Sequence, residues 1–307
     1  MADLPSPFKT PEGEGEYLAA YETTMRLWPV PYEPVQVRDR FGSTHLVMTG
    51  PRDAPPLVML HCYFTSLTSW VNNIADLSRH HRVYAPDMMG QPGKSVPVEA
   101  IRTRDEMAEW LTGVLDHVGV RDADLVGYSY GALAALNYAM RAPERVKKLV
   151  LLSPVGGLLR PSKQFYIRGA ANALSGALLP ALAPLTMRSL FHWMFYRPNL
   201  DDPGIRPIAE CIYNQMLLAT KHFRPELLSG KNFVGPFTCT DQELRSVRAQ
   251  TLLLIGELES FYDASAAAAR ARRLIPRVDA STIPGAAHDL PVTRAEIVDQ
   301  RLLDFLS

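Results

Sequence analysis

Short runs rich in Val and Leu alternate along this chain with segments in which apolar residues recur at helical spacing. Such runs, bounded by polar or turn-forming residues, are typical of buried strands. Their alternation with helices predicts a mostly parallel sheet that is covered on both faces. The expected strands span residues 35–38, 45–49, 57–61, 82–85, 123–127, 148–152, 251–255 and 278–283, and the expected helices span 17–28, 69–78, 104–118, 130–141, 263–274 and 294–306.

A long irregular insertion divides this pattern. Residues 155–240 carry many Pro, Gly and aromatic residues, and the strand–helix alternation resumes after them. The sequence therefore predicts an eight-stranded α/β core, formed by residues 17–154 and 241–307, with 155–240 as an inserted helical cap over the carboxyl ends of the strands. An ordinary helical layer is the alternative. The first two strands lack a helix between them and should form an antiparallel hairpin at one edge, and Thr240 with Glu243 has the spacing of a capping box.

Composition narrows the classes of partner and compartment. Lys plus Arg and Asp plus Glu both number 32, so no charge excess indicates a nucleic acid or an anionic membrane as partner. No run of about 18 uncharged apolar residues is present, so no membrane span is expected. Residues 1–16 are expected to be a flexible tail and lack the features of a signal peptide. Three widely spaced cysteines, Cys62, Cys211 and Cys239, favour a reducing, cytoplasmic location.

The segment Gly127-Tyr128-Ser129-Tyr130-Gly131 has the form G-x-S-x-G and lies between an expected strand and an expected helix. In that context the pattern indicates a nucleophile elbow. The sharp turn strains the serine backbone and pushes its hydroxyl into the crevice, and glycines on either side avoid collisions with neighbouring chain. Ser129 is therefore the candidate nucleophile.

A serine hydroxyl needs a base to take its proton. Of the eight histidines, His288 follows the last expected strand within a loop of small residues. That loop should lie at the same edge of the sheet as Ser129, which makes His288 the candidate base. His192 and His222 also follow Ser129 in the chain, but both lie in the insertion.

The base needs a carboxylate that fixes its tautomer. Glu257, Glu259 and Asp263 all follow the strand expected at 251–255. Asp263 precedes an alanine-rich helix and is expected to be its N-cap, while Glu257 is expected to brace the turn. Glu259 is the choice that remains, with Asp263 as the alternative.

The oxyanion of an acyl-transfer reaction needs backbone N–H donors. Tyr130 follows the nucleophile and should supply one, and Tyr63, in the loop after the strand at 57–61, should supply the other. His61 is expected to anchor that loop. Cys62 is expected to pack rather than to react, because no neighbouring base or thiolate-stabilising group is evident.

Together these motifs resemble the α/β-hydrolase family over nearly the whole chain, and within it the bacillary carboxylesterase NP group. The resemblance implies hydrolysis of carboxylic esters by a Ser–Glu–His triad without a cofactor, and it supports Glu259 over Asp263. It rests on Leu60-His61, residues 87–95, Gly127 to Gly131, residues 256–259 and His288, and, for the closer group, on residues 25–33, 143–147 and 257–263.

We expect the substrate to be a small lipophilic or aromatic ester, and the sequence leaves a homodimer open. The expected pocket is lined by Cys62, Phe64, Tyr128, Trp193 and Phe195. The family usually has glycine where this chain has Cys62, and glycine permits backbone conformations that cysteine resists. That departure keeps two alternatives open: elimination, acyl transfer or C–C cleavage by the same triad, and a non-catalytic ligand-binding protein.

Overall fold

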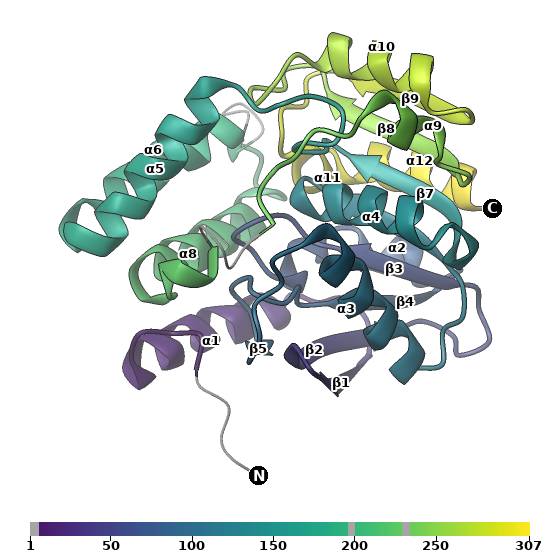
Figure 1. Cartoon of the computed structure of the whole chain (residues 1–307). Helices are drawn as coiled ribbons and strands as arrows, with labels where there is room; N and C mark the ends of the chain where they lie inside the picture. The colour runs from purple at the N-terminus through teal and green to yellow at the C-terminus, as the bar shows by residue number, and fades with distance from the viewer. Residues whose placement is uncertain (1–5, 196–199, 229–233) are drawn as a thin grey trace.

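The computed structural model describes residues 6–195, 200–228 and 234–307, and within them the core is a nine-stranded sheet (Figure 1). The strands are β1 Tyr32–Asp39, β2 Gly42–Thr49, β3 Pro56–Leu60, β4 Arg82–Pro86, β5 Val96–Pro97, β6 Ala123–Tyr128, β7 Val146–Leu152, β8 Gln250–Gly256 and β9 Val278–Ile283. Their spatial order is β1-β2-β4-β3-β6-β7-β8-β9, with β5 paired to β2. β1 and β2 form the hairpin expected at the edge, β2 and β4 are antiparallel, and the neighbours from β4 to β9 are parallel.

All eight strands expected from the apolar runs are present. Every residue of the central strand β6 is buried, which explains why its sequence is a continuous apolar run rather than an alternating one. The ninth strand, β5, corrects the expected count of eight. It pairs only Val96 and Pro97 with the start of β2, and two residues that include a proline leave no periodic pattern in the sequence.

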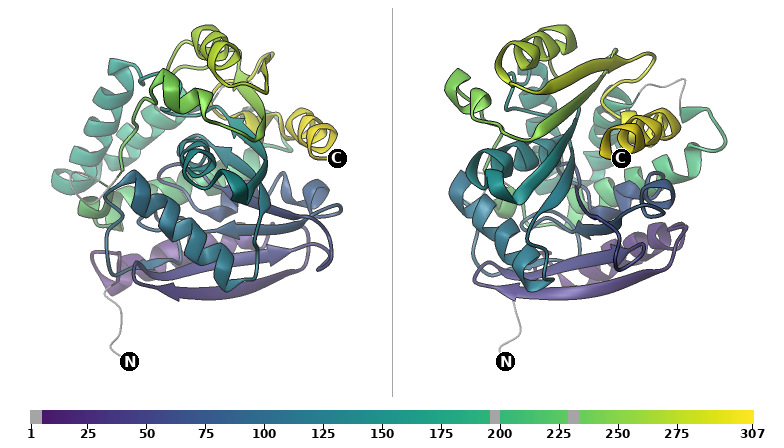
Figure 2. Two further views of the ribbon diagram at one scale, coloured as in Figure 1. Left: turned by 45° about the vertical axis from the view of Figure 1, so that its right-hand side comes forward. Right: turned by 90° about the vertical axis from the view of Figure 1, so that its right-hand side faces the viewer.

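Helices cover both faces of the sheet, as expected (Figure 2). Their bounds are α2 Ile74–Leu77, α3 Arg104–His117, α4 Tyr130–Arg141, α9 Asp241–Arg245, α10 Ala264–Leu274, α11 Leu290–Thr293 and α12 Ala295–Leu306, with 3-10 turns η1 Leu67–Trp70 and η2 Pro143–Arg145. α3 and α4 lie on one face, and α2 and α12 lie on the other. The helix expected over 69–78 is instead η1 followed by α2. The amides of Asn72 and Asn73 between them bond to Val292 and Asp299, which favours a turn over a continuous helix.

The expectation of a flexible tail through residue 16 is wrong for the described part, because α1 Pro11–Met25 begins six residues earlier than expected. Thr10 caps α1 by accepting a hydrogen bond from Gly13, and Pro11 occupies the first helical position. Phe8 is buried against Phe223 and Tyr17. The Pro and Gly residues that suggested a flexible tail therefore belong to the beginning of a helix. Residues 1–5 lie outside the described residues.

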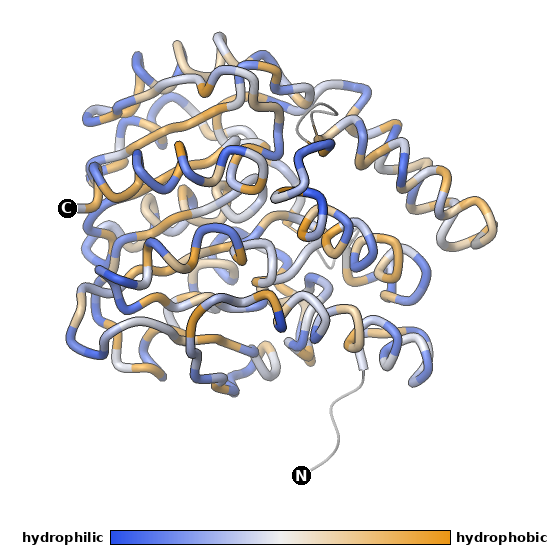
Figure 3. The backbone as a smooth tube through the Cα atoms, turned by 180° about the vertical axis from the view of Figure 1, so that it is seen from behind, coloured by the Kyte–Doolittle hydropathy of each residue, from blue (hydrophilic) through white to orange (hydrophobic). Residues whose placement is uncertain are grey.

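The insertion at 155–240 is helical in its described part, as expected. It contains α5 Lys163–Leu178, η3 Pro180–Leu182, α6 Ala183–Met194, α8 Arg206–His222 and η4 Pro225–Leu228. α8 packs against α1 and α6, whereas α5 and α6 form a hairpin that projects away from the sheet (Figure 1). Apolar positions recur along that hairpin out to its free end (Figure 3). No helix in the described ranges is both long and apolar enough to cross a bilayer.

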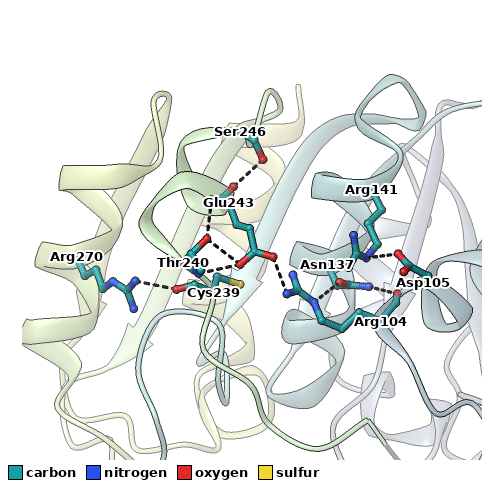
Figure 4. Close-up of polar contacts among 9 residues, drawn as sticks. All are labelled: Arg104, Asp105, Asn137, Arg141, Cys239, Thr240, Glu243, Ser246 and Arg270. Carbon is teal, nitrogen blue, oxygen red and sulfur yellow. Dashed lines mark hydrogen bonds and ion pairs between the residues drawn. The ribbon is translucent and has the colours of Figure 1, made fainter.

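The chain returns to the core through the predicted capping box (Figure 4). Thr240 Oγ1 accepts a hydrogen bond from the Glu243 N–H, and the Glu243 carboxylate accepts one from the Thr240 N–H. Arg104 of α3 donates to the same carboxylate at 2.6 Å and to Asn137 of α4 at 3.0 Å. Arg270 of α10 donates to the Cys239 carbonyl at 2.8 Å. The end of the insertion is therefore bonded directly to α9 and α10 of the core and, through Glu243, is linked to α3.

Asp299 of α12 is a buried carboxyl group that accepts a hydrogen bond from Asn73 at 2.8 Å. Burial raises the pKa of Asp299 to about 7, although the Asn73 hydrogen bond opposes the rise. The folded state therefore holds a proton that the unfolded state releases near pH 4. The free energy of unfolding should consequently fall as the pH rises from about 4 to 7, and the loss should persist above that window.

When the pH is raised from 5 to 8, we expect the stability of Asp299→Asn relative to wild type to increase by about 2–3 kcal/mol. The reason is that the amide carries no charge to desolvate. Urea unfolding at both pH values measures this gain. Asp304→Asn, an exposed change on the same helix, serves as the control and should track wild type. Parallel pH profiles for wild type and Asp299→Asn would contradict the assignment.

Candidate active site

Ser129 lies at the turn between β6 and α4 with a left-handed backbone, φ 57° and ψ −113°. Its N–H donates to the Leu152 carbonyl of β7 at 2.8 Å, which holds the strained residue against the sheet. A Cβ at Gly127 would lie 2.3 Å from the carbonyl oxygen of Gly131, and one at Gly131 would lie 2.0 Å from that of Leu60. Any larger residue at either position would push these segments apart. The glycines are therefore required by close approach, as the motif predicts.

Ser129 meets His288 and Glu259 in a continuous chain of short contacts. His288 Nε2 lies 2.8 Å from Ser129 Oγ, and His288 Nδ1 lies 2.8 Å from Glu259 Oε2. A carboxylate only accepts hydrogen bonds, so Nδ1 carries the proton and Nε2 is left as an acceptor for the serine hydroxyl. The side chains of His288 and Glu259 are both 0% exposed, so water does not compete for these bonds.

The two other candidate carboxylates are used elsewhere. Glu257 accepts a hydrogen bond from the Gly285 N–H at 3.0 Å and braces the turn before His288. Asp263 accepts one from the Ala266 N–H at 2.8 Å and caps α10. Both contacts match the expectations for these residues, and among the three carboxylates Glu259 is the one bonded to the imidazole.

Phe261 is a neighbour of this group that the sequence patterns did not single out. Its N–H donates to Glu259 Oε1 at 2.9 Å, which leaves Oε2 for the imidazole. Its ring stacks on that of His288 with centroids 4.0 Å apart and an interplanar angle of 28°. Tyr128, expected in the pocket, is buried and donates from its hydroxyl to the His288 carbonyl at 2.9 Å. Both aromatic residues thus hold the imidazole and its loop.

The loop after β3 lies beside the start of α4. The rings of Tyr63 and Tyr130 are 6.0 Å apart, and the Tyr130 hydroxyl donates to the Val234 carbonyl at 2.9 Å. Phe64 has φ 63°, and its N–H donates to Gln91 Oε1 at 2.8 Å. Gln91 is a second residue that sequence patterns missed, because only the fold brings it to this loop. The roles of the Tyr63 and Tyr130 N–H groups as oxyanion donors stay predictions.

Comparison with known proteins identifies the fold. The model of a family described as alpha/beta hydrolase fold matches residues 55–295. The chain belongs to the α/β-hydrolases. A Bacillus subtilis (strain 168) protein named uncharacterized carboxylesterase nap is 34% identical over 291 residues, which cover 95% of this chain and 92% of the relative. Carboxylesterase YbfK of the same strain is 34% identical over 301 residues, which cover 97% and 96%.

The crystal structure of naproxen esterase (carboxylesterase NP) from Bacillus subtilis matches this α/β-hydrolase with a TM-score of 0.86 at 33% identity. The match covers 97% of this chain and 100% of that one. The resemblance to the bacillary carboxylesterases is therefore confirmed, and the protein is a carboxylesterase-type hydrolase.

His61 of the α/β-hydrolase has the structural role expected of it. Its Nε2 accepts a hydrogen bond from the Met88 N–H at 2.8 Å, and its Nδ1 lies 2.9 Å from the Cys62 carbonyl. Burial lowers the pKa of His61, which keeps the ring neutral. His61 therefore joins the loop after β3 to the loop after β4. None of its hydrogen bonds within the described residues goes to the Ser129 hydroxyl group.

Cys62 is also built into this loop rather than presented as a reactive thiol. Its Sγ lies 3.1 Å from Thr65 Oγ1, and burial raises the pKa of the thiol to about 12. The non-glycine residues with positive φ in the described ranges are Phe64, Ser129 and Ser153. Cys62 therefore does not adopt the backbone conformation that would demand glycine at its position.

The two aromatic residues of the insertion that were expected in the pocket differ in their surroundings. The centroid of the Trp193 ring lies 4.7 Å from that of Phe261, and the Phe261 ring stacks on His288. The Phe195 ring stacks on Phe191 at 4.0 Å, within the insertion itself. Of these two residues, Trp193 is therefore the one that contacts a neighbour of His288. Contact of either residue with a substrate stays a prediction.

We expect Cys62 to resist alkylation in the folded α/β-hydrolase, because a buried thiol with a raised pKa exposes almost no thiolate at pH 8. Iodoacetamide treatment followed by peptide mass mapping should find label on the half-buried Cys211 before Cys62. In urea all three cysteines should react, which is the control for reagent access. Rapid labelling of native Cys62 with loss of ester hydrolysis would contradict the structural role.

Proposed function

We propose that this protein is a serine carboxylesterase in which Ser129 is the nucleophile, His288 the general base and Glu259 the acid that orients it. The single observation that carries the proposal is the buried chain of 2.8 Å contacts from Glu259 through His288 to Ser129. Such a chain makes a serine hydroxyl nucleophilic, because the proton it must lose already has an acceptor.

In the first half of the reaction Ser129 Oγ attacks the ester carbonyl carbon while His288 Nε2 takes the hydroxyl proton. The imidazolium that forms keeps its Nδ1–H on Glu259, whose negative charge stabilises it. The carbonyl oxygen becomes an oxyanion, which the N–H groups of Tyr63 and Tyr130 bind. The alcohol leaves with the proton from Nε2, and the acyl group stays on Ser129.

In the second half water takes the place of the alcohol. His288 Nε2 accepts a proton from the water, and the resulting hydroxide attacks the acyl carbon. Collapse of the second oxyanion breaks the bond to Ser129 Oγ, which recovers its proton from Nε2. The carboxylic acid is released and the resting contacts are restored.

The N-terminus of α4 adds to the stabilisation of both oxyanions. The helix begins at Tyr130, directly after the nucleophile, so its positive end faces the reacting carbonyl. A preorganised backbone donor of this kind is worth about 3–4 kcal/mol of transition-state stabilisation. The left-handed turn at Ser129 therefore serves both the nucleophile and the charge that its attack creates.

Aromatic side chains favour a lipophilic or aromatic small-molecule ester. Phe165 and Trp193, both from the insertion, contact Phe261 with ring centroids 5.0 and 4.7 Å apart. Phe261 in turn stacks on His288. Naproxen esterase, whose name denotes an aromatic acid, is similar in structure. An insertion that carries these rings next to the base would act as the cap of the site.

None of the contacts among the described residues favours elimination, acyl transfer to an acceptor other than water, or C–C cleavage. These reactions stayed open because the family usually has glycine where this chain has Cys62. The φ angle of Cys62 is not in the left-handed region, so the loop needs no glycine there. Hydrolysis leaves both an alcohol and an acid, and product analysis distinguishes it from the other reactions. A complete set of triad contacts argues against a protein that only binds ligand.

We expect a fluorophosphonate probe to label Ser129, and Ser129→Ala to lose both the label and at least about a thousandfold of aryl ester hydrolysis. Peptide mapping of the modified residue is the measurement. Ser153→Ala, at another buried serine with positive φ, is the control and should keep the label. Label on a residue other than Ser129 in the folded protein would overturn the mechanism.

Substitution of the two alternative acids separates orientation of the base from capping. Glu259→Gln should lower kcat by about three to four orders of magnitude, because an amide favours the wrong imidazole tautomer. Asp263→Ala should leave kcat nearly unchanged and cost about 1 kcal/mol of stability through loss of the α10 cap. Steady-state kinetics and thermal melting of both variants give the comparison. A larger fall of kcat in Asp263→Ala would reverse the assignment.

A further inference from the structure

The hairpin of α5, η3 and α6, called the α5–α6 hairpin, exposes an unusual concentration of large apolar side chains. Leu178, Leu185 and Ile167 are 71%, 69% and 66% exposed. Single exposed leucines are ordinary, but a contiguous group marks a contact surface. Of the twelve exposed large apolar side chains among the described residues, seven lie in this hairpin: Tyr166, Ile167, Leu174, Leu178, Leu179, Leu182 and Leu185.

α5 is inverted relative to a helix of a water-soluble surface. Its buried residues are Asn172, Ser175 and Gly176. Asn172 donates to Thr220 of α8 at 3.0 Å, and Ser175 shares a hydrogen bond with Thr186 of α6 at 2.7 Å. Surface helices normally bury their leucines and expose such polar residues. Here small and polar residues hold the helices together and the leucines face outward, as in helices that contact lipid.

The charge carried by the hairpin itself is of one sign, although Asp201 and Glu210 of the following segment line the same hollow as Arg188. From Arg145 through Leu200 the sequence contains no Asp or Glu, although the whole chain has 32 of these residues and a net charge of zero. Lys163 shares a face of α5 with Ile167, Leu174 and Leu178 by helical spacing, and Arg188 follows Leu185 by three residues on α6. The apolar surface is therefore bordered by cations without neighbouring acids from its own segment.

We propose that the α5–α6 hairpin docks on a lipid surface that carries anionic headgroups. The leucines would enter the boundary between headgroups and acyl chains, and Lys163 and Arg188 would meet the phosphates. This combination of apolar face and basic border is the one by which interfacial helices bind anionic bilayers. The contact would be with the surface only, since no described helix is able to span a bilayer.

A second copy of the chain fits the same surface less well. In a two-fold dimer the patch meets itself, and the basic border of one copy then faces that of the other. With no acids in the segment, such a contact gains apolar burial but adds like-charge repulsion. Charge complementarity therefore favours an anionic lipid partner.

The position of the hairpin relates the docking surface to the proposed active site. Phe165 of α5 and Trp193 of α6 lie at its base and contact Phe261, next to His288. Docking would hold the site close to a membrane, where lipophilic esters concentrate. The docking proposal goes beyond the proposed esterase function and does not depend on it.

Co-sedimentation of the full chain with vesicles tests the proposal. We expect binding to vesicles of phosphatidylcholine with phosphatidylglycerol, and at least tenfold weaker partitioning for Leu178→Asp/Leu185→Asp. Leu27→Asp/Ile297→Asp changes two exposed apolar residues elsewhere to the same acid, and this matched control should bind as wild type does. Ser129→Ala should also bind unchanged, so that a failure of the docking proposal is distinguishable from a failure of the esterase proposal.

A second arm tests the charge. Lys163→Gln and Arg188→Gln should each weaken binding to the anionic vesicles about fivefold, which corresponds to about 1 kcal/mol per cation. Both should have little effect on phosphatidylcholine alone, and added salt should weaken the anionic binding. Thermal melting verifies that every variant is folded, and hydrolysis of a water-soluble aryl ester verifies it for all variants except Ser129→Ala.

Three outcomes would overturn the proposal. One is no binding to anionic vesicles, and another is equal binding by wild type and Leu178→Asp/Leu185→Asp. The third is a dimer in sedimentation equilibrium that this double variant dissociates while vesicles stay unbound, which would assign the surface to a second copy of the chain.

Discussion

The left-handed backbone at Ser129 is the constraint on which the rest of the site depends. A non-glycine residue in this conformation costs about 1–3 kcal/mol and persists only where its surroundings enforce it. The bond from the Ser129 N–H to Leu152 and the close approach of Gly131 to Leu60 supply that enforcement. Because β3, β6 and β7 are adjacent and parallel in the sheet, the strain is balanced by burial of three strands rather than by local contacts.

The acid and the base are brought to the serine by a similar close approach at the next strand ends. A Cβ at Gly256, the last residue of β8, would lie 2.0 Å from the Ala287 carbonyl oxygen. The loop that carries Glu259 and the loop that carries His288 therefore pack directly on one another. Phe261 completes the arrangement, since its N–H holds one carboxylate oxygen and its ring holds the imidazole. The contacts of 2.8 Å follow from the packing of loops, and the loops follow from the order of the strands.

The net charge of this protein is zero, but the charges are unevenly distributed along the chain, and residues 145–200 form a basic segment. The acids lie outside residues 145–200, and several form ion pairs on the core, such as Glu243 with Arg104 and Asp241 with Arg270. The α5–α6 hairpin instead carries cations beside leucines, and its base carries the aromatic rings next to His288. Whole-chain composition argued against an anionic surface as partner, whereas the arrangement of the residues in space favours one.

The sequence by itself determined the strands, most of the core helices, and the identity of Ser129 and His288 as candidates, because burial pattern and turn chemistry are local properties. Turn and cap positions in the sequence favoured Glu259 over Glu257 and Asp263, and the family resemblance supported that choice. The sequence patterns misjudged α1 and missed β5, since a capped helix start resembles a Pro-rich tail and a two-residue strand has no period. Only the tertiary structure decided that Phe261 and Gln91 support the site and that Leu178 and Leu185 face outward. Those contacts join residues far apart in the chain or depend on what a helix leaves uncovered, and neither property is encoded in local spacing.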